Sequence, residues 1–251
     1  MSLTIAMAGK GGTGKTTIAG LLIRFLLKRG MKPILAVDAD ANANLNEVLG
    51  LKVEATLGEA REGIKDQVPT GMTRDIYMQY KVEEALVESE GYDLIVMGRP
   101  EGAGCYCHAN TLLTQYMERL CGNYQVVVMD NEAGMEHISR LVARSADILL
   151  IVSDPTQRGI MAAKRIHDLA RELKLDIKKD YLIINRVDGE LPAEVKEAAD
   201  SAGLNIAGCV PEDELVSRYD TEGRPTAQLP DDAGSVQALN EIFQTVILIE
   251  D

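Results

Sequence analysis

Residues 7–17 read MAGKGGTGKTT, and this glycine-rich stretch decides the fold. It contains the spacing Gly9-x-x-x-x-Gly14-Lys15-Thr16, which is the pattern of a phosphate-binding loop. An apolar run precedes it and a helical pattern follows it, which is the context that such a loop requires. Its glycines allow backbone conformations in which several N–H groups turn toward one phosphate, and the helix start adds its positive dipole end. The stretch therefore predicts a nucleotide site.

Two side chains of the loop have expected roles in this chemistry. Lys15 supplies a positive charge to the β- and γ-phosphates, and the hydroxyl of Thr16 is the expected ligand of Mg²⁺. The loop residues expected to contact the nucleotide are Gly9, Lys10, Gly11, Gly12, Thr13, Gly14, Lys15, Thr16 and Thr17.

Beyond the loop, short β-rich runs alternate with helical patterns along almost the whole chain. The expected strands are Leu3–Ala8, Pro33–Val37, Tyr92–Met97, Gln125–Met129, Ile148–Val152, Tyr181–Ile184 and Ile206–Val210. The expected helices are Thr16–Arg29, Asn110–Cys121, Glu136–Ser145, Gln157–Leu173, Pro192–Ser201 and Ser235–Leu248. This alternation implies right-handed crossovers. The sequence therefore predicts a doubly wound, mostly parallel α/β sheet in a single domain over residues 1–251, with irregular and helical segments inserted at residues 41–90.

The charge balance narrows the classes of partner. Acidic residues number 39 against 26 basic residues, a formal net charge of −13, which disfavours loose binding to DNA or to anionic lipid. No stretch approaches the roughly 20 apolar residues that cross a bilayer, and the N-terminus lacks the pattern of a secretory signal. Four cysteines are too few for a disulfide scaffold. We expect a cytoplasmic protein without a nucleic-acid or membrane partner.

The loop also carries a second lysine, Lys10, and with it GKGGTGKTT resembles the deviant Walker A sequence of the MinD/ParA/NifH class of P-loop ATPases. In that class the first lysine reaches across a nucleotide-sandwich dimer to the partner's phosphates. The resemblance implies this role for Lys10, a homodimer that depends on nucleotide or metal, and hydrolysis of ATP to ADP and phosphate.

Acidic residues follow two of the expected strands, at the edge where open α/β sheets bind ligands. The run VVVMD places an acid after apolar residues, as in a Walker B motif, and predicts that Asp130 holds Mg²⁺ through water. Within VDAD, residues 37–40, the resemblance implies that Asp40 orients the attacking water, while Asp38 lies in the second shell of Mg²⁺. Family members often have proline where this chain has Ala41, so the local geometry departs from the pattern there. Gly134 fits the glycine whose N–H meets the γ-phosphate.

Base recognition is expected from two later loops. In IINRV, Asn185 resembles the asparagine that reads adenine in this class, and Arg186 follows it in the expected nucleotide site. In VPEDEL, Pro211 and Asp213 resemble the loop that lines the other face of the base. Neither sequence is the pattern of GTPases, which favours ATP.

The stretch GCYCHAN, residues 104–110, places Cys105 and Cys107 one residue apart at the start of an expected helix. Helix N-terminal N–H groups lower thiol pKa values, and two pairs across a two-fold axis supply four sulfurs, a complete site for Zn²⁺ or Ni²⁺. Cys121 and Cys209 are expected in the core. The side chain of His108 is expected either to cap the helix at the surface or to contact the metal ligands without binding the metal itself.

Together with the loop and DNEAGMEH, the cysteine segment is similar to the CooC/AcsF-type maturation ATPases of carbon monoxide dehydrogenase and acetyl-CoA synthase. The resemblance implies a homodimeric nickel-insertion ATPase that acts on one of these nickel–iron–sulfur enzymes. An iron–sulfur cluster ATPase, like the nitrogenase reductase or the Mrp type, remains the alternative because it also uses bridging cysteines.

Overall fold

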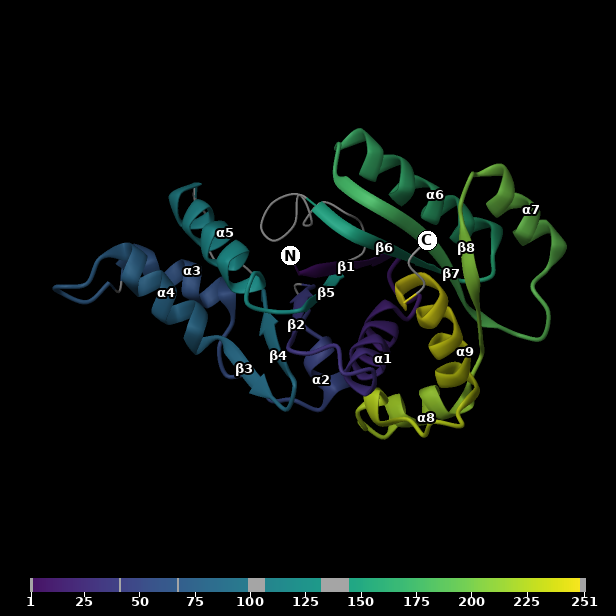
Figure 1. The fold of residues 1–251 in the computed structure, drawn as a ribbon, viewed down its shortest axis with the longest axis horizontal. Helices are drawn as coiled ribbons and strands as arrows, with labels where there is room; N and C mark the ends of the chain where they lie inside the picture. The colour runs from purple at the N-terminus through teal and green to yellow at the C-terminus, as the bar shows by residue number, and fades with distance from the viewer. Residues whose placement is uncertain (1, 41, 67, 99–106, 132–144, 249–251) are drawn as a thin grey trace.

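The computed structural model describes residues 2–40, 42–66, 68–98, 107–131 and 145–248 (Figure 1). Their strands form one sheet in the order β3-β4-β2-β5-β1-β6-β7-β8, in which only the β3–β4 pair is antiparallel. The strands are β1 (Leu3–Gly9), β2 (Ile34–Ala39), β3 (Leu86–Ser89), β4 (Tyr92–Val96), β5 (Val126–Asn131), β6 (Ser145–Ser153), β7 (Asp176–Val187) and β8 (Ile206–Pro211). The predicted doubly wound, mostly parallel α/β fold is confirmed.

Helices cover both faces of this sheet (Figure 1). One face packs against α3 (Leu57–Asp66), α4 (Arg74–Glu84), α5 (Cys107–Cys121), α6 (Gln157–Glu172) and α7 (Ala193–Ser201). The other packs against α1 (Lys15–Lys28), α2 (Leu45–Leu49), α8 (Glu214–Thr221) and α9 (Gly234–Phe243). A 3₁₀ turn, η1 (Thr226–Gln228), and a π-helical turn, η2 (Gln244–Leu248), complete the described elements.

The continuously apolar strands explain the two helical layers. Successive side chains of a strand point to opposite faces, so Ile5 and Met7 of β1 join one core cluster while Ala6 and Ala8 join the other. All four are at most 1 % exposed. A strand that buries both faces needs helices on both sides, which places β1 and the loop after it in the centre of the molecule.

The structure corrects several sequence-based boundaries. Ser145, predicted as the end of a helix, is the first residue of β6 and pairs with Asp176 of β7. The rest of that predicted helix lies outside the described residues. β7 begins at Asp176 rather than at Tyr181, because polar residues extend the β6–β7 pairing beyond the apolar run. The sequence analysis did not predict β3 or α8.

The two described cysteines outside the pair lie where the sequence placed them. Cys121 ends α5 and Cys209 lies in β8, and each packs, partly buried, against the core. Among the described residues, no helix is long and apolar enough to span a membrane.

Candidate functional site

The glycine-rich loop connects the carboxyl end of β1 to the first turn of α1. Gly14 precedes α1 with a φ of 90°, a conformation that glycine adopts without the strain a side chain would bring. A Cβ atom on Gly9 would lie 2.3 Å from the carbonyl oxygen of Val152 in β6, so only glycine fits there. The side chain of Lys15 is buried, with Nζ 3.3 Å from the carbonyl oxygen of Lys10. The side chain of Lys10 itself is exposed.

The two acids of VDAD, residues 37–40, have different environments. Asp38 is fully buried at the end of β2, and its carboxylate accepts hydrogen bonds from the N–H groups of Leu45 (2.9 Å) and Asp40 (3.0 Å). Burial raises the pKa of Asp38 to about 6, although these N–H groups act to lower it. Asp40 lies at the rim of the cleft, where its carboxylate accepts from the N–H of Asn42 (2.8 Å). Asp38 thus fixes the turn that presents Asp40 to the cleft.

Asp130 lies beside Asp38 on the neighbouring strand β5, directly opposite it in the parallel register. Burial is the main cause that raises the pKa of Asp130 to about 7; the Thr16 side chain hydrogen-bonds to it and lowers the pKa, while nearby Asp38 raises it. Its Oδ1 atom is buried and has no hydrogen-bond partner among the described residues. A buried carboxylate oxygen without a partner, next to a second carboxylate and a hydroxyl, suits a hard cation with oxygen ligands. These residues therefore fit Mg²⁺, with Thr16, Asp130 and Asp38 as the groups around it.

The residues expected at the base lie around the ends of β7 and β8. Asn185 donates a hydrogen bond from Nδ2 to the carbonyl oxygen of Thr13 (2.8 Å), so it ties the end of β7 to the loop. Arg186 follows with a φ of 60°, at an irregularity in the β7–β8 pairing. Pro211 and Asp213 line the same small hollow of about 90 Å³ together with Asn185 and Arg186. The four residues thus meet at one place, although Asn185 and Arg186 lie near the end of β7 while Pro211 and Asp213 lie at and just after the end of β8.

Asp213 also has a structural task that the sequence did not indicate. Its carboxylate caps α8 by accepting from the N–H of Leu215 (2.9 Å). It also accepts from the N–H (3.0 Å) and the hydroxyl (2.8 Å) of Ser235 at the start of α9. Partial burial acts to raise the pKa of Asp213, but these hydrogen bonds outweigh it and lower the pKa.

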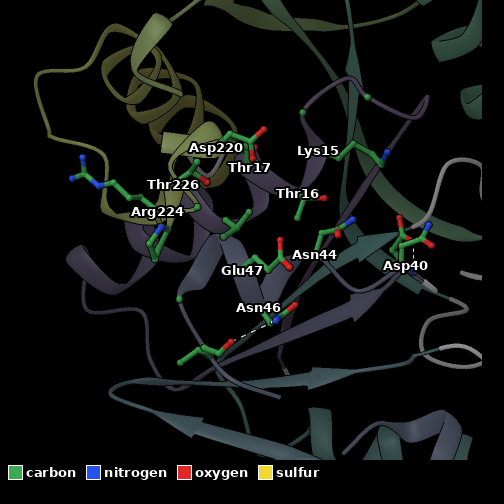
Figure 2. A pocket seen from close by; sticks show the side chains of 18 of the residues that line it. Lys15, Thr16, Thr17, Asp40, Asn44, Asn46, Glu47, Asp220, Arg224 and Thr226 are labelled. Atoms are coloured by element: carbon green, nitrogen blue, oxygen red, sulfur yellow. Dashed lines mark hydrogen bonds between the residues drawn. The ribbon is translucent and has the colours of Figure 1, made fainter. Parts of the chain in front are cut away.

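A cleft of about 850 Å³ runs from the loop along α2 to the turn after α8 (Figure 2). Lys15 and Asp40 lie at one end, Arg224 lies at the other, and Glu47 lies between them. Asp220 lines both the cleft and the hollow at the base end. The sequence analysis missed Glu47, Asp220 and Arg224. The only signal for the last two was the segment after VPEDEL, which was not recognised as a helix.

The other predicted site residues are placed only in part. Gly11, Gly12, Thr16 and Thr17 line the cleft. Cys107 is the first residue of α5, which begins three residues before the predicted helix start at Asn110. Cys105 and Gly134 lie outside the described residues. Within the described ranges, no group of three or more His, Cys, Asp or Glu side chains is arranged to hold a metal ion.

Comparison with known proteins agrees with this geometry. The family model of the CobQ/CobB/MinD/ParA nucleotide binding domain matches residues 4–226. An ATP-binding protein of Methanocaldococcus jannaschii is 42 % identical over 98 % of each chain. The carbon monoxide dehydrogenase accessory protein CooC of Rhodospirillum rubrum is 31 % identical over 88 % of each chain.

A solved structure shares the fold. The septum site-determining protein MinD of Pyrococcus horikoshii, complexed with Mg-ADP, superposes with a TM-score of 0.73 at 22 % identity, covering 98 % of this chain and 96 % of that one. The family model describes a nucleotide binding domain, which agrees with the site built around the phosphate loop. The chain belongs to the CobQ/CobB/MinD/ParA family and is a nucleotide-hydrolysing ATPase.

Proposed function

We propose that this ATPase is a metallochaperone, which binds nickel through Cys105 and Cys107 at a dimer interface and assists its insertion into a carbon monoxide dehydrogenase or an acetyl-CoA synthase. The observation that carries the proposal is that the cysteine segment begins beside Asp38, at the edge of the sheet where the nucleotide site lies. The N–H of Met97, after β4, donates to the carbonyl oxygen of Asp38 (2.8 Å), and the segment that contains the cysteines begins two residues later. Similarity to the CooC protein of Rhodospirillum rubrum supports the choice of client.

In the proposed hydrolysis, each residue of the site acts on charge or on water. Lys15 and the N–H groups of the loop stabilise the charge that develops on the phosphates. Asp40, which faces the cleft, orients the attacking water, and Asp38 holds the turn that carries Asp40. Lys10, exposed on the loop, supplies its charge to the nucleotide of the second protomer. Mg²⁺ neutralises phosphate charge when it is bound.

The nucleotide would control the metal through the dimer. When ATP draws two protomers together, two Cys-x-Cys pairs meet and supply four thiolates, which suit Ni²⁺ and also Zn²⁺. Because Met97 hydrogen-bonds to Asp38 and lies two residues before the cysteine segment, a change in the turn around Asp38 and Asp40 on hydrolysis would reach that segment over a few residues. The ion would then lose part of its ligand set and pass to the client.

The test is a double substitution, Cys105→Ser with Cys107→Ser, with Cys121→Ser as the matched control. Equilibrium dialysis against nickel in the presence of ATP should show loss of tight binding in the double variant and full binding in the control. ATP binding should be unchanged in both. Retention of stoichiometric nickel by the double variant would exclude the proposed metal site.

A four-iron cluster of the nitrogenase-reductase kind, the rival function, could use Cys105 or Cys107 with one other cysteine of each chain. Cys121 suits this poorly, since burial raises the pKa of its thiol to about 11 and opposes the thiolate that a cluster requires. Burial also raises the pKa of Cys209. The ultraviolet–visible spectrum of the isolated protein separates the two functions, because a brown protein with thiolate–iron absorption would support the cluster.

A further inference from the structure

Helix α6 and the start of β7 are unusually basic for this acidic chain. Residues 157–179 contain seven basic and three acidic side chains, whereas the whole chain has 26 basic and 39 acidic residues. All seven basic residues are exposed: Arg158, Lys164, Arg165, Arg171, Lys174, Lys178 and Lys179. Figure 1 shows α6 along the outer side of the molecule, beside β6 and β7.

One face of this helix combines charge with apolar surface. Arg158, Met161 and Arg165 succeed one another at spacings of three and four residues, which places them on a single face. Met161 is 57 % exposed and is one of four large hydrophobic side chains at the surface of the described residues. The opposite face of α6 is buried against the sheet through Ile160, Ala163, Ile166 and Ala170. We call Arg158, Met161 and Arg165 the α6 face.

The charges of the α6 face are not explained by the described part of the chain. Neither arginine forms an ion pair with any residue that the structure describes, in contrast to Lys164, which pairs with Asp168 (2.5 Å). Arg158 also lies in the first turn of α6, which contains no acidic residue, so its charge opposes the helix dipole. An exposed cation that is unfavourable for its own helix, and that pairs with no described acid, is suited to pair with an acidic group of an external partner.

We propose that the α6 face docks an acidic segment of the client enzyme, in which two carboxylates flank an apolar side chain. This inference rests on the proposed function. Two arginines seven residues apart lie about 10 Å apart along the helix axis, and carboxylates at that separation would pair with both of them. Met161 between them supplies the apolar contact, which favours a protein partner over a phosphate backbone.

The position of the α6 face connects docking to the nucleotide. α6 follows β6, whose Val152 carbonyl oxygen approaches Gly9 of the phosphate loop closely enough to require glycine there. Thr156 caps α6 by accepting from the N–H of Gly159 (3.0 Å), so a short, fixed turn joins that strand to the α6 face. A client bound at this face would therefore lie next to the edge of the sheet where ATP is hydrolysed.

The test compares two double charge reversals that change the net charge equally. Arg158→Glu with Arg165→Glu alters the α6 face, while Lys52→Glu with Lys196→Glu alters exposed lysines elsewhere. Binding to the nickel-free carbon monoxide dehydrogenase of the same organism is measured by biolayer interferometry at low and high salt, and basal ATP turnover confirms that each variant is folded. We expect the first variant to bind at least about tenfold more weakly, with a smaller salt dependence, and the control to bind almost normally.

Each remaining outcome counts against the inference. If the unaltered protein does not bind the dehydrogenase, the dehydrogenase is excluded as the client and the docking inference fails, whereas the proposed function is left with an acetyl-CoA synthase as its client. If binding survives the reversal of Arg158 and Arg165, only the docking inference is refuted. If the unaltered protein instead binds a short DNA duplex or phosphatidylglycerol vesicles through this face, the partner class is wrong.

Discussion

Replacement of Asp130 by asparagine should stabilise the metal-free protein. Burial and the neighbouring Asp38 raise the pKa of Asp130 from 3.8 to about 7, whereas the unfolded chain keeps the ordinary value. The folded state therefore binds more protons than the unfolded state, and its free energy of unfolding falls as the pH rises from about 4 to 7. A difference of about 3 pKa units corresponds to about 4 kcal/mol above pH 7. An asparagine at this position would keep the shape of the side chain without this cost.

Urea denaturation with a chelator and without nucleotide measures the effect. At pH 8, Asp130→Asn should raise the free energy of unfolding by up to about 4 kcal/mol, and below about pH 4 the gain should vanish because the wild-type carboxyl is then protonated in both states. Mg²⁺ with ADP should stabilise the wild-type protein strongly and the variant much less.

Asp147→Asn is a control substitution that should change the free energy of unfolding in the opposite direction. Partial burial acts to raise the pKa of Asp147, but hydrogen bonds from Lys178 and from the N–H of Thr4 outweigh it and lower the pKa. Its removal should therefore destabilise the protein at pH 8. If Asp130→Asn were equally stable or less stable than wild type at pH 8, Asp130 would not be a desolvated carboxylate held for a cation.

Three further substitutions test single roles. Asp40→Ala should reduce phosphate release about 100-fold while ATP still binds in equilibrium dialysis, and unchanged turnover would remove Asp40 from catalysis. Lys10→Ala should weaken hydrolysis more than nucleotide binding, so an equal loss of both would contradict a role across the dimer. Asn185→Ala removes the hydrogen bond to the carbonyl oxygen of Thr13 and leaves that group without this partner. We expect the free energy of unfolding, measured with heat or urea, to fall by about 1–2 kcal/mol and ATP to bind more weakly. No change in either quantity would show that the hydrogen bond between β7 and the loop is unimportant.

The sequence predicted those parts of the molecule that depend on residues close together in the chain or on the ends of neighbouring parallel strands. The phosphate loop was predicted because its glycines, lysine and threonine are contiguous between an apolar strand and a helix. Asp38 and Asp130 were predicted at the same edge because parallel strands bring their carboxyl ends together, and the structure shows them opposite each other in register. Both strands extend slightly farther than predicted, so these acids lie among the last paired residues rather than after them.

Features that depend on distant partners could not be predicted in this way. Asp213 joins α8 to the start of α9 through Ser235, 22 residues away. Asn185 and Thr13, 172 residues apart, are joined by a single hydrogen bond. The helix α8 has only eight residues, and it carries Asp220 toward the cleft, so its short pattern gave no sign of a contribution to the site. The polar ends of β6 and β7 pair with each other although neither has the apolar pattern of a strand.

Native mass spectrometry of the Asp40→Ala protein with ATP and nickel tests the proposed metallochaperone most directly. If ATP governs the assembly of one shared thiolate site, the spectrum should show two chains with two ATP molecules and a single nickel ion. Removal of ATP, or the change of Cys105 and Cys107 to serine, should abolish the nickel-bound species. One nickel ion per isolated chain, independent of nucleotide, would contradict the proposal.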